Sequence, residues 1–421
     1  FILLPSCAPV NNIFIEKISN PTDPSEKQES QLENKNKQIL KLNKINSQVN
    51  EIIPSFDYEI QNKITIILSK NDNPDIVKQF INIIELAVYQ KKLEKISFEI
   101  KLYDSPEQLI IFLDNSNLSG KIFIGPLGTS DTKLLKKYCN KGVIFFSFSS
   151  NKNLANDCVY LVNFFPENEI RTIFDYLPQN SKVALLYPEN AYGFGINKII
   201  DNIVDKSNSV IVNRASYNEN LSNAPNAIKE LGKYELRKYE LNRQKKILSS
   251  KKDKESKKRL IKLERFQTTG DLNFTHVIIA DYGLRLLQVA PLLPYYDIDP
   301  NIVKFVGTGA WDDKVFYDEP SLNGSIYPGI EFINRKKLIE DYFELYDEKL
   351  FRTSTLPYDL IGLLAFVINN KYNLTSFYKL LNQSNIKFSG VDGSFYFLNN
   401  AIERDLNILK INEGKATRIS K

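Results

Sequence analysis

The chain has 421 residues, of which 43% are apolar and 25% are charged, and its formal net charge is +5. This balance is typical of a globular protein with a sizeable core, so it excludes a fully disordered or collagen-like chain, and the length predicts two to three domains. Three cysteines and a single histidine, His276, exclude a disulfide scaffold and most histidine-built metal sites.

The N-terminal segment begins Phe-Ile-Leu-Leu-Pro-Ser-Cys. An apolar run that ends in Leu-x-Ser-Cys resembles the end of a bacterial lipoprotein signal peptide, which predicts that residues 1–7 are the end of such a signal and that Cys7 is lipidated. Acyl chains would then hold the protein on a membrane. The alternative is a short hydrophobic segment with an incidental cysteine. Residues 8–62 are rich in Asn, Lys, Gln, Ser and Glu, which predicts a polar tether.

From residue 63 the pattern alternates between apolar runs of strand length and segments with helical periodicity. The expected strands are 64–68, 97–103, 121–124 and 143–146, and the expected helices are 74–90, 105–114 and 131–138. Repeated units of this kind require parallel strand pairing with right-handed crossovers. These residues therefore predict an open, doubly wound α/β sheet.

The same alternation then starts again. The expected helices are 166–176, 194–204, 283–292, 338–346 and 357–369, and the expected strands are 182–187, 209–212, 275–280 and 304–308, with terminal strands within 388–411. The sequence thus predicts an α/β fold of two doubly wound parallel-sheet lobes with a hinge between them. Residues 63–165 and 330–411 are expected to form the first lobe, and residues 166–329 the second.

An insertion at residues 229–265 interrupts the second lobe. It holds 15 Lys or Arg and 6 Asp or Glu, a local net charge of +9, while the rest of the chain sums to −4. Sparse Leu and Ile at near-helical spacing predict a protruding charged helix or helical hairpin. Two interpretations stay open: a solvated charged helix, or a contact with anionic lipid headgroups or an acidic partner. No aromatic and glycine motif typical of RNA binding accompanies the charge, so nucleic acid is not an expected partner.

Motifs that would indicate an enzyme are incomplete. The pair Gly193 and Gly195 lacks the third glycine of a dinucleotide-binding fingerprint, and no Gly-Lys-Ser/Thr phosphate loop is present. The paired acids at 297 and 299 and at 312 and 313 lack partner ligands at metal spacing. Cys139 and Cys158 are interpreted as buried thiols, although an oxidising compartment would permit a bridge. The sequence therefore predicts no enzyme activity, no cofactor and no metal.

Several loops that follow predicted strands carry small and hydroxyl residues, where parallel sheets bind ligands. They contain Ile-Gly-Pro-Leu (124–127), Phe-Ser-Phe-Ser (146–149), Tyr-Gly (192–193) and Gly-Thr-Gly-x-Trp-Asp-Asp (307–313). In this order they resemble type I periplasmic-binding proteins of the leucine-binding kind. Further motifs, at 163–167, 292–297 and 390–395, make the chain most similar to the penicillin-binding-protein activator lipoproteins of that family. The first-strand loop 68–72 (Leu-Ser-Lys-Asn-Asp) departs from the family pattern.

The resemblance implies a two-lobed clamp that binds without chemistry. In amino-acid-binding members, first-lobe hydroxyls and amides receive the ligand carboxylate and a second-lobe acid receives the ammonium. Each candidate also has a structural interpretation. The hydroxyls at the strand ends could bond to the local backbone, and Asp281 could cap a helix. Tyr192 could pack at a helix start, and Trp311 could belong to the core. The expected wall residues are Thr129, Ser147 and Ser149 in the first lobe, and Tyr192, Asp281 and Trp311 in the second.

Two functions follow from the resemblance. The first is a non-enzymatic lipoprotein of the periplasm, anchored by lipid to a bacterial membrane, expected to be the outer membrane, that activates a peptidoglycan-synthesising penicillin-binding protein by docking. The alternative is a solute receptor that delivers a small amino-acid-like ligand to the permease of a branched-chain amino-acid ABC transporter. A receptor must pair both charged ends of its ligand, because a buried unpaired charge is costly.

Overall fold

The structure is a computed structural model that describes residues 58–383 and 385–419. The expected signal-peptide end 1–7, with Cys7, and most of the expected tether 8–62 lie outside the described residues. The last residues of that tether are part of the folded body: the Leu374 N–H donates to the Tyr58 carbonyl at 2.9 Å, and the Gln61 N–H donates to the Gly120 carbonyl at 2.9 Å. The folded body therefore includes residues 58–62, which the sequence assigned to the tether.

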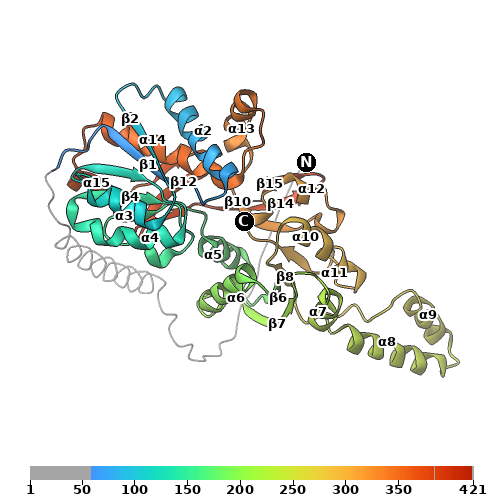
Figure 1. Ribbon diagram of the computed structural model, residues 1–421. Helices are drawn as coiled ribbons and strands as arrows, with labels where there is room; N and C mark the ends of the chain where they lie inside the picture. Colours follow the sequence, from blue (N-terminus) through green and yellow to red (C-terminus); the bar gives the residue numbers. More distant parts are fainter. Residues whose placement is uncertain (1–57, 384, 420–421) are drawn as a thin grey trace, which may run out of the picture. The chain divides into compact units, whose positions relative to one another are not determined.

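The first lobe is built on an eight-stranded sheet with the order β11-β12-β13-β5-β4-β3-β1-β2 (Figure 1). Its five parallel strands come from the first part of the chain: β1 (Lys63–Ser69), β2 (Ser97–Tyr103), β3 (Lys121–Ile124), β4 (Val143–Ser147) and β5 (Val159–Leu161). Three strands near the C-terminus complete it: β11 (Phe388–Gly390), β12 (Gly393–Leu398) and β13 (Ala401–Arg404). β13 pairs in parallel with β5.

Local sequence signals position the helices of the first lobe. In α2, the Asn73 side chain caps the N-terminus, Pro74 occupies the first turn, and an apolar face is buried around Ile83. The helices and 3₁₀ turns of this lobe are α2 (Pro74–Gln90), α3 (Pro106–Asp114), α4 (Thr129–Leu135), η1 (Lys136–Lys141), η2 (Lys152–Leu154), α13 (Ile333–Tyr346), η5 (Arg352–Thr355), α14 (Leu356–Asn369) and α15 (Leu374–Leu381).

The second lobe is built on a seven-stranded sheet with the order β15-β14-β10-β9-β8-β6-β7. Its parallel strands are β6 (Lys182–Pro188), β7 (Val210–Tyr217), β8 (His276–Ile279), β9 (Lys304–Val306) and β10 (Ile326–Gly329), and its antiparallel strands are β14 (Asn407–Asn412) and β15 (Lys415–Arg418). The accompanying helices are α5 (Pro166–Tyr176), α6 (Ala191–Val204), α7 (Ala224–Leu231), α10 (Gly283–Val289), α11 (Leu292–Tyr295), α12 (Lys314–Tyr317), η3 (Gly309–Trp311) and η4 (Pro320–Leu322). His276 begins β8 and is partly buried.

The predicted fold class, two doubly wound lobes of mostly parallel strands, is confirmed. One boundary needs correction: residues 330–411 do not all return to the first lobe. The chain first passes from one lobe to the other between Leu161 and Pro166, and it returns between Gly329 and Ile333. β14 pairs with β10, with Ile326 opposite Lys410, so a third passage lies between Arg404 and Asn407. The strand pattern predicts that residues near 411 form a strand, but it does not say which sheet receives it.

The charged insertion is a helical hairpin of α8 (Tyr234–Ser249) and α9 (Lys254–Leu263), which extends from α7 (Figure 1). Lys229 belongs to α7, so the hairpin begins five residues after the expected start of the insertion. Among the described residues, no helix combines the length and the apolar character needed to cross a bilayer.

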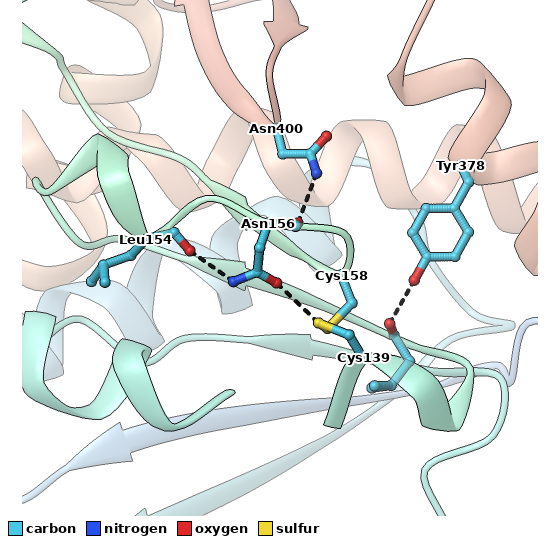
Figure 2. The surroundings of a disulfide bond; sticks show 7 residues. Cys139, Leu154, Asn156, Cys158, Tyr378 and Asn400 are labelled. Carbon is cyan, nitrogen blue, oxygen red and sulfur yellow. Dashed lines mark hydrogen bonds between the residues drawn. A yellow bond between two sulfur atoms is a disulfide. The ribbon is translucent and has the colours of Figure 1, made fainter. Parts of the chain in front are cut away.

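Cys139 and Cys158 form a disulfide with a Cα–Cα distance of 5.0 Å, so their interpretation as buried thiols was wrong (Figure 2). The bond ties η1 to the start of β5. Asn156 fixes the adjoining turn: its side-chain amide donates to the Leu154 carbonyl at 3.0 Å, and its own carbonyl accepts from the Asn400 side chain at 2.7 Å. The periodicity of the sequence does not indicate that these two cysteines approach each other. The turn at Asn156 brings them within bonding distance.

Candidate functional site

The three expected hydroxyls of the first lobe lie together, but they bond to one another and to the backbone. Thr129 Oγ1 lies 3.0 Å from Ser149 Oγ. Ser147 Oγ lies 2.7 Å from Thr132 Oγ1 and 3.1 Å from the Pro126 carbonyl. Ser147 and Ser149 are 0% and 1% exposed, and their hydroxyls bond to neighbouring threonine hydroxyls and to the local backbone, as their structural interpretation predicted.

A pair of carboxylates stands beside those hydroxyls. A Cβ placed on Gly128 would lie within 4 Å of both Asp72 and Asp131. Burial, followed by repulsion from Asp131, raises the pKa of Asp72, and the Tyr103 hydroxyl donates to Asp131 at 2.5 Å. Asp72 ends the loop 68–72 that departs from the family pattern. An acidic wall at this place disfavours a ligand carboxylate.

Two of the expected second-lobe residues are core residues. Asp281 is fully buried and is held by Arg285, with Nε of Arg285 2.8 Å from Oδ2, and by the Tyr217 hydroxyl at 2.5 Å. Trp311 is also fully buried, and its indole N–H donates to the Asp281 carbonyl at 3.0 Å. A Cβ on Gly307 would lie 2.0 Å from the indole ring, so the glycine makes room for the tryptophan.

A cavity of about 310 Å³ lies where the chain passes between the two sheets. Of the six expected wall residues, only Tyr192 lines it, and the Tyr192 hydroxyl lies 2.7 Å from Thr308 Oγ1. The first and third passages and the end of β10 contribute to the lining, together with α5 of the second lobe and η5 of the first. The lining residues that carry charge or aromatic rings are Phe164, Phe165, Glu169, Tyr192, Asp312, Arg352 and Arg404.

Glu169 is the acidic group of the second lobe that faces this cavity without an ion-pair partner in the described residues. Its carboxylate accepts from the Gly309 N–H at 2.9 Å, and a Cβ on Gly309 would lie 2.3 Å from it. Burial raises the pKa of Glu169 to about 7, against the opposing effects of the Gly309 N–H and Arg352. Glu169, and not Asp281, is therefore the second-lobe acid without an ion-pair partner that lines the cavity.

Buried ion pairs cross from one lobe to the other beside the cavity. Asp312 of the second lobe accepts from Arg335 at 2.7 Å and from Arg352 at 3.2 Å, and both arginines belong to the first lobe. Arg352 also pairs with Asp392 at 2.7 Å. Burial alone would raise the pKa of Asp392, but the surrounding guanidinium groups outweigh burial and lower it. We call Asp312, Arg335, Arg352 and Asp392 the interlobe clamp.

Phe164, on the first passage between the lobes, packs under two arginines. The guanidinium carbon of Arg352 lies 3.9 Å from the ring centroid, and that of Arg404 lies 5.3 Å from it. Arg404 also pairs with the buried Asp359 at 3.3 Å. A ring face attracts a guanidinium group, so the aromatic residue of the passage helps to hold the arginines at the cavity.

The described residues contain no group of three or more His, Cys, Asp or Glu side chains that could hold a metal ion. Of the charged groups that line the cavity, Asp312, Arg352 and Arg404 form ion pairs, and Glu169 accepts a backbone N–H. This arrangement can hold two lobes together or bind a small polar molecule.

No family model matches the sequence. A curated protein, the uncharacterised protein RP748 of Rickettsia prowazekii (strain Madrid E), is 27% identical over 173 residues, which are 39% of this chain and 46% of that protein. The chain thus aligns with less than half of this relative's length.

Solved structures share the fold at low identity. A branched-chain amino acid ABC transporter periplasmic ligand-binding protein from Burkholderia xenovorans LB400 matches 86% of this chain and 95% of its own, with a TM-score of 0.58 and 9% identity. The C-domain of LpoA from Haemophilus influenzae, a regulator of PBP1A, matches 85% of this chain and 100% of its own, with a TM-score of 0.55 and 13% identity.

Full-length LpoA from the same organism has a TM-score of 0.58 and 13% identity, and the match covers 87% of this chain and 60% of LpoA. The chain therefore has the two-lobe fold of type I periplasmic-binding proteins, and the expected resemblance, which includes a regulator of penicillin-binding proteins, is confirmed at the level of fold. These neighbours are binding or regulatory proteins.

Sequence reasoning missed Glu169, Arg352 and Arg404. The first lies two residues beyond the motif at 163–167, which was recognised as a family feature without being assigned to the site. The two arginines reach the cavity from segments far along the chain, and only the three passages between the lobes bring them together.

Proposed function

We propose that this protein is a non-catalytic docking module of the cell envelope that regulates a penicillin-binding protein by direct contact. The observation that carries the proposal is that the expected amino-acid contacts are already occupied: Ser147 and Ser149 bond internally, and Asp281 is held by Arg285. A receptor site must leave such groups free for its ligand. The likeness to LpoA supports this assignment.

The interlobe clamp also favours docking. Asp312 and Arg335 are 6% and 3% exposed at their side chains, so they keep the two lobes together without any ligand between them. A buried charge pair is disrupted only at a large cost. A surface formed by both lobes is therefore presented in a fixed arrangement, as recognition by a protein partner requires.

We further propose that the protein resides in the periplasm, lipid-anchored through Cys7 to a bacterial membrane, the outer membrane. The disulfide between Cys139 and Cys158 supports an oxidising compartment. The periplasmic location named for the Burkholderia protein agrees with it.

A second candidate function is that of a solute receptor for an amino-acid ABC transporter, and the cavity is the observation that favours it. Its volume of about 310 Å³ is in the range of small-ligand sites. Glu169 would receive an ammonium group, and Arg352 or Arg404 a carboxylate. Both arginines, however, already pair with aspartates, so a ligand would have to displace existing ion pairs.

One pair of measurements distinguishes the two functions. The purified full-length protein is immobilised and exposed to a purified peptidoglycan-synthesising penicillin-binding protein, and it is separately titrated with a mixture of amino acids by calorimetry. We expect capture of the synthase and no heat from the amino acids. Glu169→Gln serves as the matched variant and should leave capture unchanged. Heat that disappears in Glu169→Gln, with no capture, would instead establish the receptor.

A further inference from the structure

A buried arginine at the base of the hairpin of α8 and α9 bonds to the second lobe. Arg237 is 5% exposed. Its Nε donates to the Gly232 carbonyl at 2.7 Å, and its terminal nitrogens donate to Thr268 Oγ1 and to the carbonyls of Thr269, Tyr296 and Asp297 at 3.0–3.2 Å. Five bonds from one guanidinium fix the base of the hairpin, so its distal part is held in a defined position.

The positive charge gathers beyond that base. Residues 243–266, which we call the distal hairpin, contain eleven Lys or Arg and three Asp or Glu, a net charge of +8. All of these cations except Lys245 are exposed. Within the described part of the chain, Arg243 is the one cation of the distal hairpin with an ion pair, to Glu240 at 3.0 Å. The charge is therefore available to a partner.

Large apolar side chains are exposed among these cations. Ile247 is 48% exposed, Ile261 is 59% exposed and Phe266 is 58% exposed. The Lys245 ammonium group donates to the Phe266 carbonyl at 3.1 Å, which joins the end of α9 to α8. Apolar side chains within a lysine-rich surface are typical of segments that lie in the headgroup region of a bilayer.

The hairpin is attached at the amino ends of strands of the second sheet, and the cavity lies at their carboxyl ends. Arg237 bonds to residues that precede β8 and β9, at the amino ends of these strands. Gly309 and Asp312, which line the cavity, follow the carboxyl end of β9. A surface bound by the distal hairpin would therefore leave the cavity uncovered.

We propose that the distal hairpin docks on the surface of an anionic phospholipid bilayer. Charge complementarity alone would also fit an acidic protein. The exposed Ile and Phe side chains favour a lipid surface over an acidic protein. The headgroup region accepts apolar groups at any position, whereas a protein partner needs a matching pocket for each. This inference is independent of the proposed contact with a penicillin-binding protein.

Vesicle co-sedimentation tests the inference. All proteins in this experiment, including the one used as wild type, carry Cys7→Ser, so that no acyl chain contributes to binding. Vesicles of phosphatidylcholine alone are compared with vesicles that also contain phosphatidylglycerol, at low and at high salt. We expect binding to the anionic vesicles only, and its loss at high salt.

The variant Lys257→Gln, Lys258→Gln, Arg259→Gln removes three cations of the distal hairpin. Its partition coefficient onto anionic vesicles at low salt should fall on the order of a hundredfold. The apolar variant Ile261→Ser, Phe266→Ser should also bind more weakly.

The matched control removes three exposed lysines of the first lobe: Lys133→Gln, Lys136→Gln, Lys137→Gln. It has the same net charge as the hairpin variant and should bind like the wild type. Equal losses in both triple variants, or equal binding of the wild type to neutral and anionic vesicles, would overturn the proposal. Retention on immobilised polyglutamate without a preference for anionic vesicles would indicate an acidic protein partner and would also overturn it.

Discussion

Glu169 combines a half-buried carboxylate with a glycine that makes room for it. The Gly309 N–H supplies one hydrogen bond, and no cation of the described residues pairs with the carboxylate directly. Burial disfavours the charged form, so the folded protein holds this proton to about pH 7, whereas a free glutamate loses it near pH 4.5. The ionised Glu169 therefore lowers the free energy of unfolding at neutral pH.

The sign of this effect can be tested. Because the folded state binds more protons than the unfolded state between pH 4.5 and about 7, the contribution of Glu169 to stability falls as pH rises through that window. Glu169→Gln should remove this contribution and, above pH 7, raise the free energy of unfolding by about 2 kcal/mol. Urea unfolding at several pH values measures it. The exposed Glu94→Gln should keep the wild-type profile, and an unchanged profile for Glu169→Gln would contradict the argument.

At the scale of elements, the disulfide joins the 3₁₀ turn η1 to strand β5, across 19 residues of chain. Closing a loop of this length lowers the entropy of the unfolded chain and stabilises the fold by about 3 kcal/mol. The variant Cys139→Ser, Cys158→Ser should lose this amount in urea unfolding.

Reductant provides the matching control for the disulfide. It should destabilise the wild type by the same amount and leave the double variant unchanged. A wild type that is insensitive to reductant would show that the bond contributes nothing to stability.

The individual elements were largely predictable from sequence because each one carries its own signal. The run Ile-Thr-Ile-Ile-Leu of β1 is buried along its whole length, and Asn73 and Pro74 mark the start of α2. The partner of a strand has no such local signal. β14 was expected as a terminal strand, but its place beside β10 depends on Ile408 and Leu409 fitting the core of the second lobe.

The candidate site was less predictable, for a related reason. Thr129 and Ser149 were expected on one wall of a ligand cleft; their hydroxyls lie 3.0 Å apart, because the two residues follow neighbouring parallel strands. Whether a hydroxyl is free or already bonded depends on tertiary contacts such as that of Ser147 with Thr132. Arg352 is distant in sequence from Glu169, and no spacing rule connects them.

At the scale of the whole folded body, the interlobe clamp decides how firmly the lobes hold together. Asp312→Asn should leave Arg335 and Arg352 without their shared carboxylate and lower the free energy of unfolding by about 3–5 kcal/mol. Small-angle scattering should also show a larger radius of gyration.

The neighbouring residue provides the control for the clamp. Asp313 pairs with Lys349, which is 80% exposed at its side chain, so Asp313→Asn should cost less than about 1 kcal/mol. Similar losses in the two variants would show that the clamp is no stronger than a surface ion pair.

The shared C-terminal strands have a consequence for synthesis. On the ribosome, β5 emerges long before β13, its parallel neighbour, and β10 emerges well before β14. Until residues 401–412 emerge, β5 and β10 each lack a neighbouring strand on one side. Such an unpaired strand edge is prone to pair with other chains. Neither lobe can therefore complete its sheet until residues 401–412 have been synthesised.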